Sequence, residues 1–257
     1  MSENKIKSPI VIAGIGQLGS VFAQGFLRAG YPVYPVIRNM RLSDYTDGIP
    51  EPELVLLAVP ENSIVEAIRQ VPRVWRDRLG LLQNELLPYV WEAEGIVNPT
   101  VMAVWFEKKK GHTVKVFQAT PVFGPKAETV CTALTARGIP CRIVADREQL
   151  TLELIKKNLY VLTINIAGLS VGGTTGELWR NHQALAIAVA QDVLSVLEHL
   201  TGTASDRDRM IEFLADILTA VPDHGCRGRV AGDRLARILH IARTAGLATP
   251  NLDRISE

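Results

Sequence analysis

Cysteine, net charge and long apolar runs are all scarce in this sequence, and each shortage excludes a class of protein. The 257 residues include only three cysteines, Cys131, Cys141 and Cys226, which are scattered and lack the spacing of a metal site. So few cysteines favour a reducing compartment over a disulfide-stapled scaffold. A formal net charge of +1 gives no support to a nucleic-acid partner or to an anionic membrane surface.

No signal peptide and no membrane span are expected. The first seven residues contain no apolar signal core, and no uninterrupted apolar run reaches the length that a membrane helix needs. With 47% hydrophobic and 21% charged residues, the chain is expected to be a soluble, globular, cytoplasmic protein. Its length is enough for two modest domains.

What the chain does contain is a glycine motif near its start. An apolar run over residues 10–13 leads into Gly14-Ile-Gly16-Gln17-Leu18-Gly19, a segment of helical period follows as far as Gly30, and a β-rich run covers residues 33–37. A strand–helix–strand unit of about 30 residues around Gly-x-Gly-x-x-Gly is typical of a dinucleotide-binding site, although glycines also mark ordinary turns.

Each glycine of the motif has its own predicted role. Gly14 permits the tight turn, Gly16 lets the backbone approach a pyrophosphate, and Gly19 lets the helix pack closely on the strand. The helix that starts near Gln17 presents backbone N–H groups and the positive end of its dipole to the phosphates, so Gln17 and Leu18 are also expected to bind the cofactor.

The end of the second strand indicates which dinucleotide binds. An NAD site usually has Asp or Glu there for the ribose 2′-hydroxyl, whereas Arg suits the 2′-phosphate of NADP. This chain has Arg38 at that place, with Arg41 nearby and no carboxylate before Asp44. The alternative is an arginine that is merely solvated after a strand, but the pattern favours NADP.

The remaining patterns predict an α/β fold, that is, a Rossmann-type mostly parallel sheet followed by an all-helical C-terminal domain. Strands are expected at residues 54–59, 79–83, 101–106, 113–119 and 141–144, and a helix at 124–137; Val59, at the end of the first of these runs, is expected to face the cofactor. The lysine run at 108–110 is predicted to be a hairpin turn.

Later segments have only helical periodicity, at about 149–168, 177–201, 206–221 and 228–246. The predicted domains are therefore an NADP-binding domain at 1–147 and a helical substrate-binding and dimerisation domain at 148–257.

This layout resembles the ketopantoate reductase family. Five local matches support the resemblance: the glycine motif with Arg38, Gln83-Asn84 at the end of a late strand, Lys157 followed eight residues later by Asn165, Gly176-Glu177-Leu178 after a long helix, and the ending from Ala242 to Asn251. The resemblance implies that Asn84 lies near the nicotinamide and the substrate, that Lys157 is catalytic, and that Asn165 binds the substrate. It also allows a homodimer.

The substrate half of the resemblance contains departures. Val161 stands where the family has a second asparagine, and Val230 stands where it has an essential glutamate. Asp233, three residues later on the expected helix, is the nearest carboxylate and becomes a candidate substrate-binding residue. The family's anchoring serine has no counterpart in residues 224–229. Ketopantoate itself is therefore expected to be a poor substrate.

The residues themselves suggest how a carbonyl would be reduced. Lys157 can protonate the developing alkoxide, and its apolar neighbours should lower the pKa of its amine; a solvated stripe formed by Lys156 and Lys157 is the alternative. Asn165, about 12 Å further along the helix, either meets the far end of a substrate or makes a structural contact between helices. Arg227, like Arg229, could pair a substrate carboxylate or simply decorate a loop.

The function predicted from the sequence is an NADP-dependent oxidoreductase that reduces a small 2-keto acid or a related carbonyl. An imine or opine-type reductase on the same plan and a non-catalytic NADP-binding sensor are the alternatives. The expected partner is a small-molecule substrate, with no metal, nucleic acid or membrane.

Overall fold

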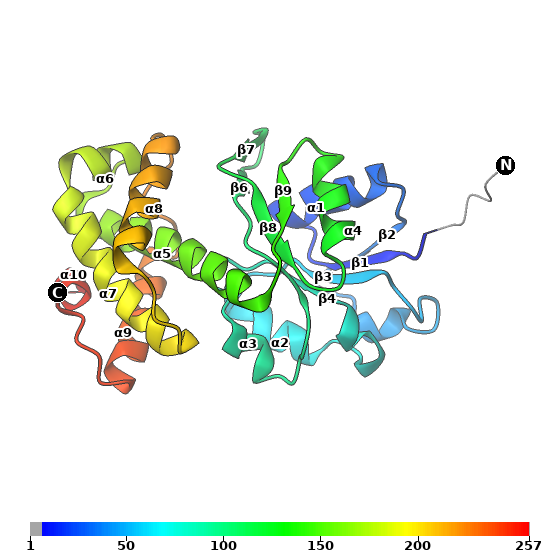
Figure 1. Ribbon diagram of the computed structural model, residues 1–257. Coiled ribbons are helices and arrows are strands. Elements are labelled where there is room, and N and C mark those ends of the chain that lie inside the picture. Colours follow the sequence, from blue (N-terminus) through cyan, green and yellow to red (C-terminus); the bar gives the residue numbers. More distant parts are fainter. Residues whose placement is uncertain (1–6, 257) are drawn as a thin grey trace. The chain divides into compact units, whose positions relative to one another are not determined.

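The computed structural model describes residues 7–256 and divides the chain into two compact units, Met1–Leu150 and Thr151–Glu257. The first unit is a mostly parallel sheet covered by helices, and the second is helical (Figure 1). The α/β class predicted from the sequence, a Rossmann-type sheet followed by a helical domain, is thus confirmed.

The first unit is built on a seven-stranded sheet. In spatial order the strands are β2 (Val33–Val36), β1 (Ile10–Ala13), β3 (Leu54–Leu57), β4 (Leu79–Leu81), β5 (Thr100–Met102), β8 (Thr120–Phe123) and β9 (Cys141–Ile143). Neighbouring strands are parallel except for β5 and β8. All residues of β1 and β3 are buried, as expected for central strands that have helices on both faces.

Helices cover both faces of this sheet (Figure 1). On one side lie α1 (Gln17–Arg28) and α4 (Ala127–Thr135), and on the other α2 (Ile64–Arg69) and α3 (Pro88–Glu92); short 3₁₀ turns occupy Leu42–Tyr45, Glu61–Ser63 and Arg73–Arg78. A Cβ placed on Gly25 of α1 would lie 2.5 Å from the carbonyl oxygen of Ala133 in α4. Only glycine therefore allows these two helices to pack as closely as they do.

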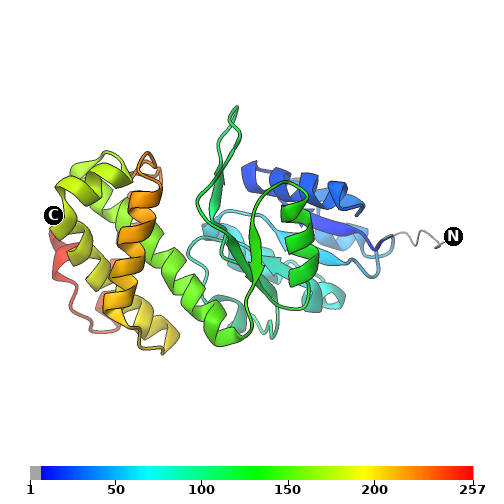
Figure 2. The same cartoon turned by 45° about the horizontal axis from the view of Figure 1, so that its top comes forward.

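The strands expected at 101–106 and 113–119 are more divided than the sequence indicated. Each contributes to the separate hairpin of β6 (Phe106–Lys108) and β7 (Val114–Val116), which projects away from the main sheet (Figure 2). The lysine run does lie at its turn, as predicted. Strand β8 was missed: its run Thr-Pro-Val-Phe is short and contains a proline, which usually argues against a strand inside a sheet.

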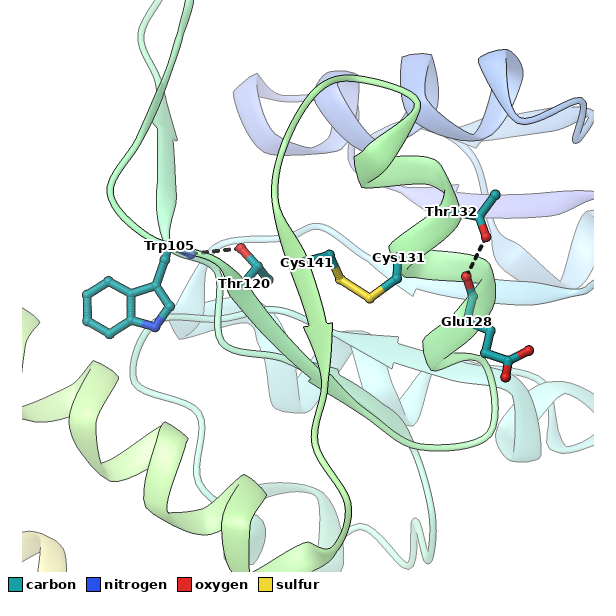
Figure 3. The surroundings of a disulfide bond; sticks show 6 residues. All are labelled: Trp105, Thr120, Glu128, Cys131, Thr132 and Cys141. Carbon is teal, nitrogen blue, oxygen red and sulfur yellow. Dashed lines mark hydrogen bonds between the residues drawn. A yellow bond between two sulfur atoms is a disulfide. The ribbon is translucent and has the colours of Figure 1, made fainter.

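Two of the three cysteines are paired, which the sequence analysis did not anticipate. Cys131 on α4 and Cys141 on β9 form a disulfide that ties the helix to the edge strand of the sheet (Figure 3). Nothing in their spacing revealed this, since the pairing depends on α4 and β9 being neighbours in the fold. A disulfide is unusual in a reducing compartment, so the cytoplasmic location stays a prediction that this bond weakens.

The described residues of the second unit form six helices. They are α5 (Arg147–Val171), whose first turn belongs to the first unit, α6 (Thr175–Asn181), α7 (Gln183–Thr201), α8 (Arg207–Ala220), α9 (Ala231–Thr244) and α10 (Pro250–Ser256). The segment expected as one helix at 177–201 is broken at His182, and α10 was not predicted. The start of α6 is held by a capping box, in which the Thr174 hydroxyl accepts the N–H of Glu177 and the Glu177 carboxylate accepts the N–H of Thr174.

Helix α7 is apolar because it lies in the core of this unit. Among the described residues it is the one helix that could cross a membrane by length and composition, whereas the sequence was expected to contain none. Eight of its side chains are buried in the structure. One of them, Asp192, accepts the backbone N–H groups of Asn251 and Leu252 at 2.7 and 3.1 Å, and so caps α10.

Breaking the disulfide should destabilise the protein. The cysteines are 10 residues apart, and a cross-link of this span removes unfolded-chain entropy worth roughly 2–3 kcal/mol. We expect the melting temperature, measured by circular dichroism, to fall by several degrees in the double variant Cys131→Ser/Cys141→Ser and in the parent treated with dithiothreitol. Dithiothreitol should not affect the double variant. If dithiothreitol left the melting temperature of the parent unchanged, the Cys131–Cys141 disulfide would be contradicted.

Candidate functional site

The order of the strands creates a crevice at the carboxyl ends of the central strands. Strand β1 lies between β2 and β3, so the chain runs from β1 through α1 to β2 on one side and then crosses to β3 on the other. Helices that leave neighbouring strands in opposite directions leave room between them at such a switch point. In open α/β sheets this is where ligands bind.

A cavity of about 650 Å³ opens at this point. Its walls come from the ends of β1, β2 and β3 and from α1 and α2, and they are mostly apolar. The residues that line it are Ala13, Gly14, Ile15, Gly16, Gln17, Leu18, Val36, Ile37, Arg38, Met40, Leu42, Ala58, Val59, Pro60, Ala67, Gln70 and Leu82. Volume and lining are in the usual range for a small-molecule or cofactor site.

The three glycines of the motif differ sharply in what surrounds them. Gly14 has a φ of +95°, and a Cβ there would lie 2.5 Å from the carbonyl oxygen of Ala58. A Cβ on Gly19 would lie 2.0 Å from the carbonyl oxygen of Gly14. Around Gly16, by contrast, nothing lies within 4 Å of the place where a Cβ would be. Gly14 and Gly19 thus serve close packing, whereas Gly16 faces open space in the cavity.

The start of α1 suits an anion. Gly16 is the N-cap, no side chain accepts the N–H groups of the first turn, and no acidic residue lies in that turn. The first N–H groups of a helix have no partner within the helix, and the helix dipole places partial positive charge there. With the open space at Gly16, these features fit the pyrophosphate of a dinucleotide.

Arg38 and Val59, both predicted to contact the cofactor, also line the cavity. Arg38 follows β2, is exposed, and is the one charged residue among those that line it. Val59 follows β3. Among the residues that line the cavity, none is a carboxylate and Arg38 is the one cation.

Gln83 and Asn84 are neighbours in sequence, but only Gln83 bonds to the strand ends beside the cavity. The buried Gln83 side chain donates to the carbonyl oxygens of Leu57 and Val59, at 2.7 and 3.2 Å, and accepts the N–H of Leu82 at 3.1 Å. It therefore holds the ends of β3 and β4 together beside the cavity. Asn84 is half-buried in the following turn and, like Gly19, is not among the lining residues.

Sequence reasoning missed the wall of the cavity beyond the motif. Met40 and Leu42 come from the link after β2, and Ala67 and Gln70 come from α2 and its end. These residues have no distinctive type or spacing. They meet only because α2 and the link between β2 and β3 pack beside the same strand ends, which is a tertiary effect.

In the second unit, Lys157 lies on α5 and is only 5% exposed. Its Nζ lies 5.9 Å from the centre of the Tyr160 ring. The neighbouring Lys156 is different, because its amine is more exposed and pairs with Glu153 at 3.1 Å. Lys157 is therefore not part of a solvated lysine stripe, and the sequence-based alternative fails for this residue.

Asn165, one of the predicted substrate-binding residues, is buried on the same helix. Its Nδ2 donates to the carbonyl oxygen of Val161 at 3.0 Å, and its Oδ1 accepts from the guanidinium of Arg234 at 3.0 Å. Arg234 belongs to α9, is 7% exposed and was not predicted. The two other predicted residues, Arg227 and Asp233, are exposed. The structure thus joins Asn165 to a buried arginine that the sequence did not single out.

The segment at residues 221–230 is fastened to α5 and α6. The N–H of Thr175 donates to the carbonyl oxygen of His224 at 2.8 Å, and the N–H of Cys226 donates to that of Gly173 at 3.0 Å. A Cβ on Gly168 of α5 would lie 2.9 Å from Cys226, so the segment sits directly on the helix. Burial, with a contribution from Glu177, raises the pKa of the Cys226 thiol to about 11. This thiol is therefore protonated at neutral pH and is no nucleophile.

Tyr160 and His224 connect the same segment to α5 near Lys157. The Tyr160 hydroxyl is hydrogen-bonded to Nδ1 of His224, and the two rings are stacked with their centres 5.9 Å apart. Within residues 7–256, no group of three or more His, Cys, Asp or Glu side chains is placed to hold a metal ion.

A dinucleotide-type cavity at the switch point of a Rossmann sheet, followed by a helical unit, defines the class of fold. Solved structures of this class are similar to nearly the whole chain. D-mandelate dehydrogenase with NADH and anilino(oxo)acetate matches at 14% identity over 96% of each chain, with a TM-score of 0.69. A 2-dehydropantoate 2-reductase from Methylococcus capsulatus matches at 14% identity over 96% of this chain and 94% of its own, with a TM-score of 0.69. A dimeric ketopantoate reductase from Staphylococcus aureus matches at 17% identity over 96% of each chain, with a TM-score of 0.70.

These likenesses show a shared fold. The expected resemblance to ketopantoate reductases is confirmed at that level. No protein-family model matches the sequence, and none of the curated proteins matches it either.

The contrast between Gly16 and Gly19 makes a test of the cavity. Gly16→Val places its side chain in open space at an ordinary φ of −77°, so the melting temperature should stay close to that of the parent. Nicotinamide dinucleotide binding, measured by fluorescence titration, should weaken at least about tenfold because the side chain occupies the space for the pyrophosphate. Gly19→Val, the matched control, should instead lower the melting temperature, because its Cβ collides with Gly14. Normal binding by a folded Gly16→Val variant would show that the motif is only a turn.

Proposed function

We propose that this protein is an NADP-dependent oxidoreductase that reduces a small 2-keto acid or a related carbonyl. One observation carries the proposal: the glycine turn opens on a cavity at the switch point whose one charged lining residue is Arg38. The similar solved structures support an oxidoreductase that uses a nicotinamide cofactor, since one of them contains NADH and others are 2-dehydropantoate 2-reductases. Membership of the ketopantoate reductase family is part of this proposal.

The residues of the first unit would hold the cofactor. The backbone at Gly16 and the start of α1 would bind the pyrophosphate, and Arg38 would bind the 2′-phosphate. Gln83 would keep the Val59 peptide in place at the cavity wall, because its amide bonds the carbonyl oxygen of Val59. When bound, the nicotinamide supplies the hydride for reduction of the carbonyl. Asn84 remains the proposed contact to the nicotinamide and the substrate.

Lys157 would supply the proton. As the carbonyl carbon is reduced, negative charge develops on its oxygen, and an ammonium group both stabilises this charge and donates the proton. Lys157 is buried, so its amine is held away from bulk water. The attraction between the ammonium group and the developing negative charge is stronger in the protein interior than it would be in water. A small-molecule substrate and a homodimer, in line with the dimeric reductase of the same fold, belong to the same proposal.

Cofactor preference should follow Arg38. We expect NADPH to bind at least about tenfold more tightly than NADH, because a hydrogen bond to a charged group contributes roughly 1.5–3 kcal/mol. Arg38→Asp should abolish or reverse the preference in fluorescence titrations. Arg41→Asp, an exposed arginine outside the lining residues, is the matched control and should leave the ratio nearly unchanged. Equal affinities of the parent for both cofactors would refute the NADP assignment.

Turnover should depend on Lys157 and much less on Lys156. The assay is NADPH oxidation with a panel of 2-keto acids and imines, and Lys157→Ala should reduce kcat by about two to four orders of magnitude, the usual share of a general acid. Lys156→Ala should have a small effect, because Lys156 points about 100° away around the helix and its amine pairs with Glu153. Cofactor affinity should survive both changes.

Three outcomes of this assay would decide against the proposal. Equal loss in the two lysine variants would mean that the wrong face of α5 had been assigned. Turnover of imines alone would indicate an imine or opine-type reductase. Tight NADPH binding with no turnover of any compound in the panel would indicate a non-catalytic sensor.

A further inference from the structure

A second cavity lies at the opposite edge of the sheet from the one that contains the glycine motif. Its volume is about 530 Å³, and its walls come from the segments just before β4 and β5 and just after β8, which is antiparallel to β5. The residues that line it are Arg76, Asp77, Arg78, Gly95, Ile96, Val97, Asn98, Pro125 and Lys126. The two cavities share no lining residue.

Positive charge predominates in this second lining. Three of its residues are cations, Arg76, Arg78 and Lys126, whereas Asp77 is the one carboxylate among them. The two arginines belong to the turn before β4, and Lys126 comes from a separate segment, at the start of α4. A hollow in which cations from two segments come together attracts an anion that carries more than one negative charge.

Arg76 is the least neutralised of the three cations. One nitrogen of its guanidinium donates to the backbone carbonyl oxygen of Glu94 at 3.1 Å, whereas its Nε is buried and has no hydrogen-bond partner within the described part of the chain. The carboxylate of Glu94 is held by Arg69 through two hydrogen bonds of 2.8 and 2.9 Å. Arg69 is the main cause of the lowered pKa of Glu94, and the charge of Arg76 is the smallest cause. A buried N–H without an acceptor is rare and calls for a partner.

Arg78 and Lys126 have acidic neighbours that neutralise them to different extents. Arg78 lies 3.9 Å from Glu51 and 3.7 Å from Asp77, and the side chains of these two acids are 80% and 73% exposed. Both distances exceed that of a hydrogen bond, and water screens the attraction, so the charge of Arg78 is only weakly neutralised. The amine of Lys126, by contrast, lies 3.0 Å from Glu53 in a partly buried pair. Lys126 therefore offers hydrogen-bond donors more than net charge.

The fold holds the walls of this cavity in place. Gly124 has a φ of +115°, and a Cβ there would lie 2.5 Å from the carbonyl oxygen of Pro99, so only glycine lets the chain pass this close to the start of β5. Two residues later, the N–H of Lys126 donates to the hydroxyl of Thr100 at 3.0 Å. On the other side, each arginine donates one hydrogen bond to a backbone carbonyl oxygen. Side chains that are positioned in this way lose less freedom when they bind a ligand.

We propose that this cavity is a second binding site, which takes a small molecule with a multiply charged oxyanion, either a phosphate compound or a polycarboxylate. Arg76 and Arg78 bind its charge, and the amine of Lys126 donates to its oxygens. The volume is in the range of small-molecule sites, so an organic body fits beside Ile96 and Pro125. The inference does not rest on the proposed reduction, because no residue of the cofactor cavity takes part.

Calorimetric titration of the full-length protein tests this site, with pyrophosphate and citrate as separate probes. Pyrophosphate can also enter the cofactor cavity, so every titration is repeated in the Gly16→Val background. In that background, Arg76→Gln and Lys126→Gln should each weaken binding by about tenfold or more, the effect of losing a hydrogen bond to a charged group. Affinity should fall as the salt concentration is raised, because these cations are only partly buried.

Two further variants sharpen the test. Arg73→Gln, the matched control, removes an exposed arginine of the same turn that does not line the cavity, and it should leave both affinities unchanged. Asp77→Asn removes the one carboxylate of the lining, and it should tighten binding by roughly two- to fivefold, the size of an exposed charge contact. Because Asp77 is exposed, this variant decides the matter even if Arg76→Gln does not fold. Melting temperatures of all variants are measured alongside.

The results divide clearly. The site is overturned if neither probe binds in the Gly16→Val background, if Arg73→Gln weakens binding as much as Arg76→Gln does, or if Asp77→Asn weakens it. Binding that Gly16→Val abolishes belongs to the cofactor cavity, which would refute the second site and leave the proposed function intact. Selective loss in the Arg76 and Lys126 variants supports the site, and the probe that binds more tightly identifies the ligand as a phosphate compound or a polycarboxylate.

Discussion

The first unit depends on how closely α1 can approach the ends of β1 and β3. A Cβ on Gly19 would lie 2.0 Å from the carbonyl oxygen of Gly14, and a Cβ on Gly14 would lie 2.5 Å from that of Ala58. With any other residue at these positions, the helix would have to move away from the strands. With glycine at these positions the helix stays close to the strands, so the start of α1 and the open space at Gly16 lie at the switch point of the sheet. The cavity forms there because of this close packing.

Contacts of the same kind assemble the polar groups of the second unit. Gly168 lets the segment at 221–230 rest on α5 through Cys226, and Gly228 lets it pass beside Asn165. A long apolar helix such as α5 can therefore keep an amine, a carboxamide and a guanidinium partner buried among its neighbours. In both units, glycine allows close approach, of backbone to backbone at Gly14, Gly19 and Gly168 and of backbone to the Asn165 side chain at Gly228.

Some features were predictable because they depend on local sequence. The strand–turn–helix at residues 10–28, the buried run of β3 and the periodicity of α5 follow from patterns within one segment, and the structure contains all three. The features that were missed depend on partners far away in the sequence. Strand β8 contains a proline and is stabilised by its pairing with β5 and β9, the disulfide needs α4 beside β9, and α10 is capped by Asp192 of α7.

The residues of the proposed site also fall into two groups, those that the local sequence predicted and those that depend on tertiary packing. By itself the sequence determined the glycine motif with Arg38 after the second strand, and the spacing that puts Lys157, Val161 and Asn165 on one face of a helix, because strand ends and helical period are properties of short segments. Only the tertiary structure decided that Lys157 is buried, that Arg234 rather than Arg227 meets Asn165 across 69 residues of sequence, and that Met40 and Gln70 join the cavity wall. The physical reason is that burial and contact between helices arise from packing, which no spacing along a single segment encodes.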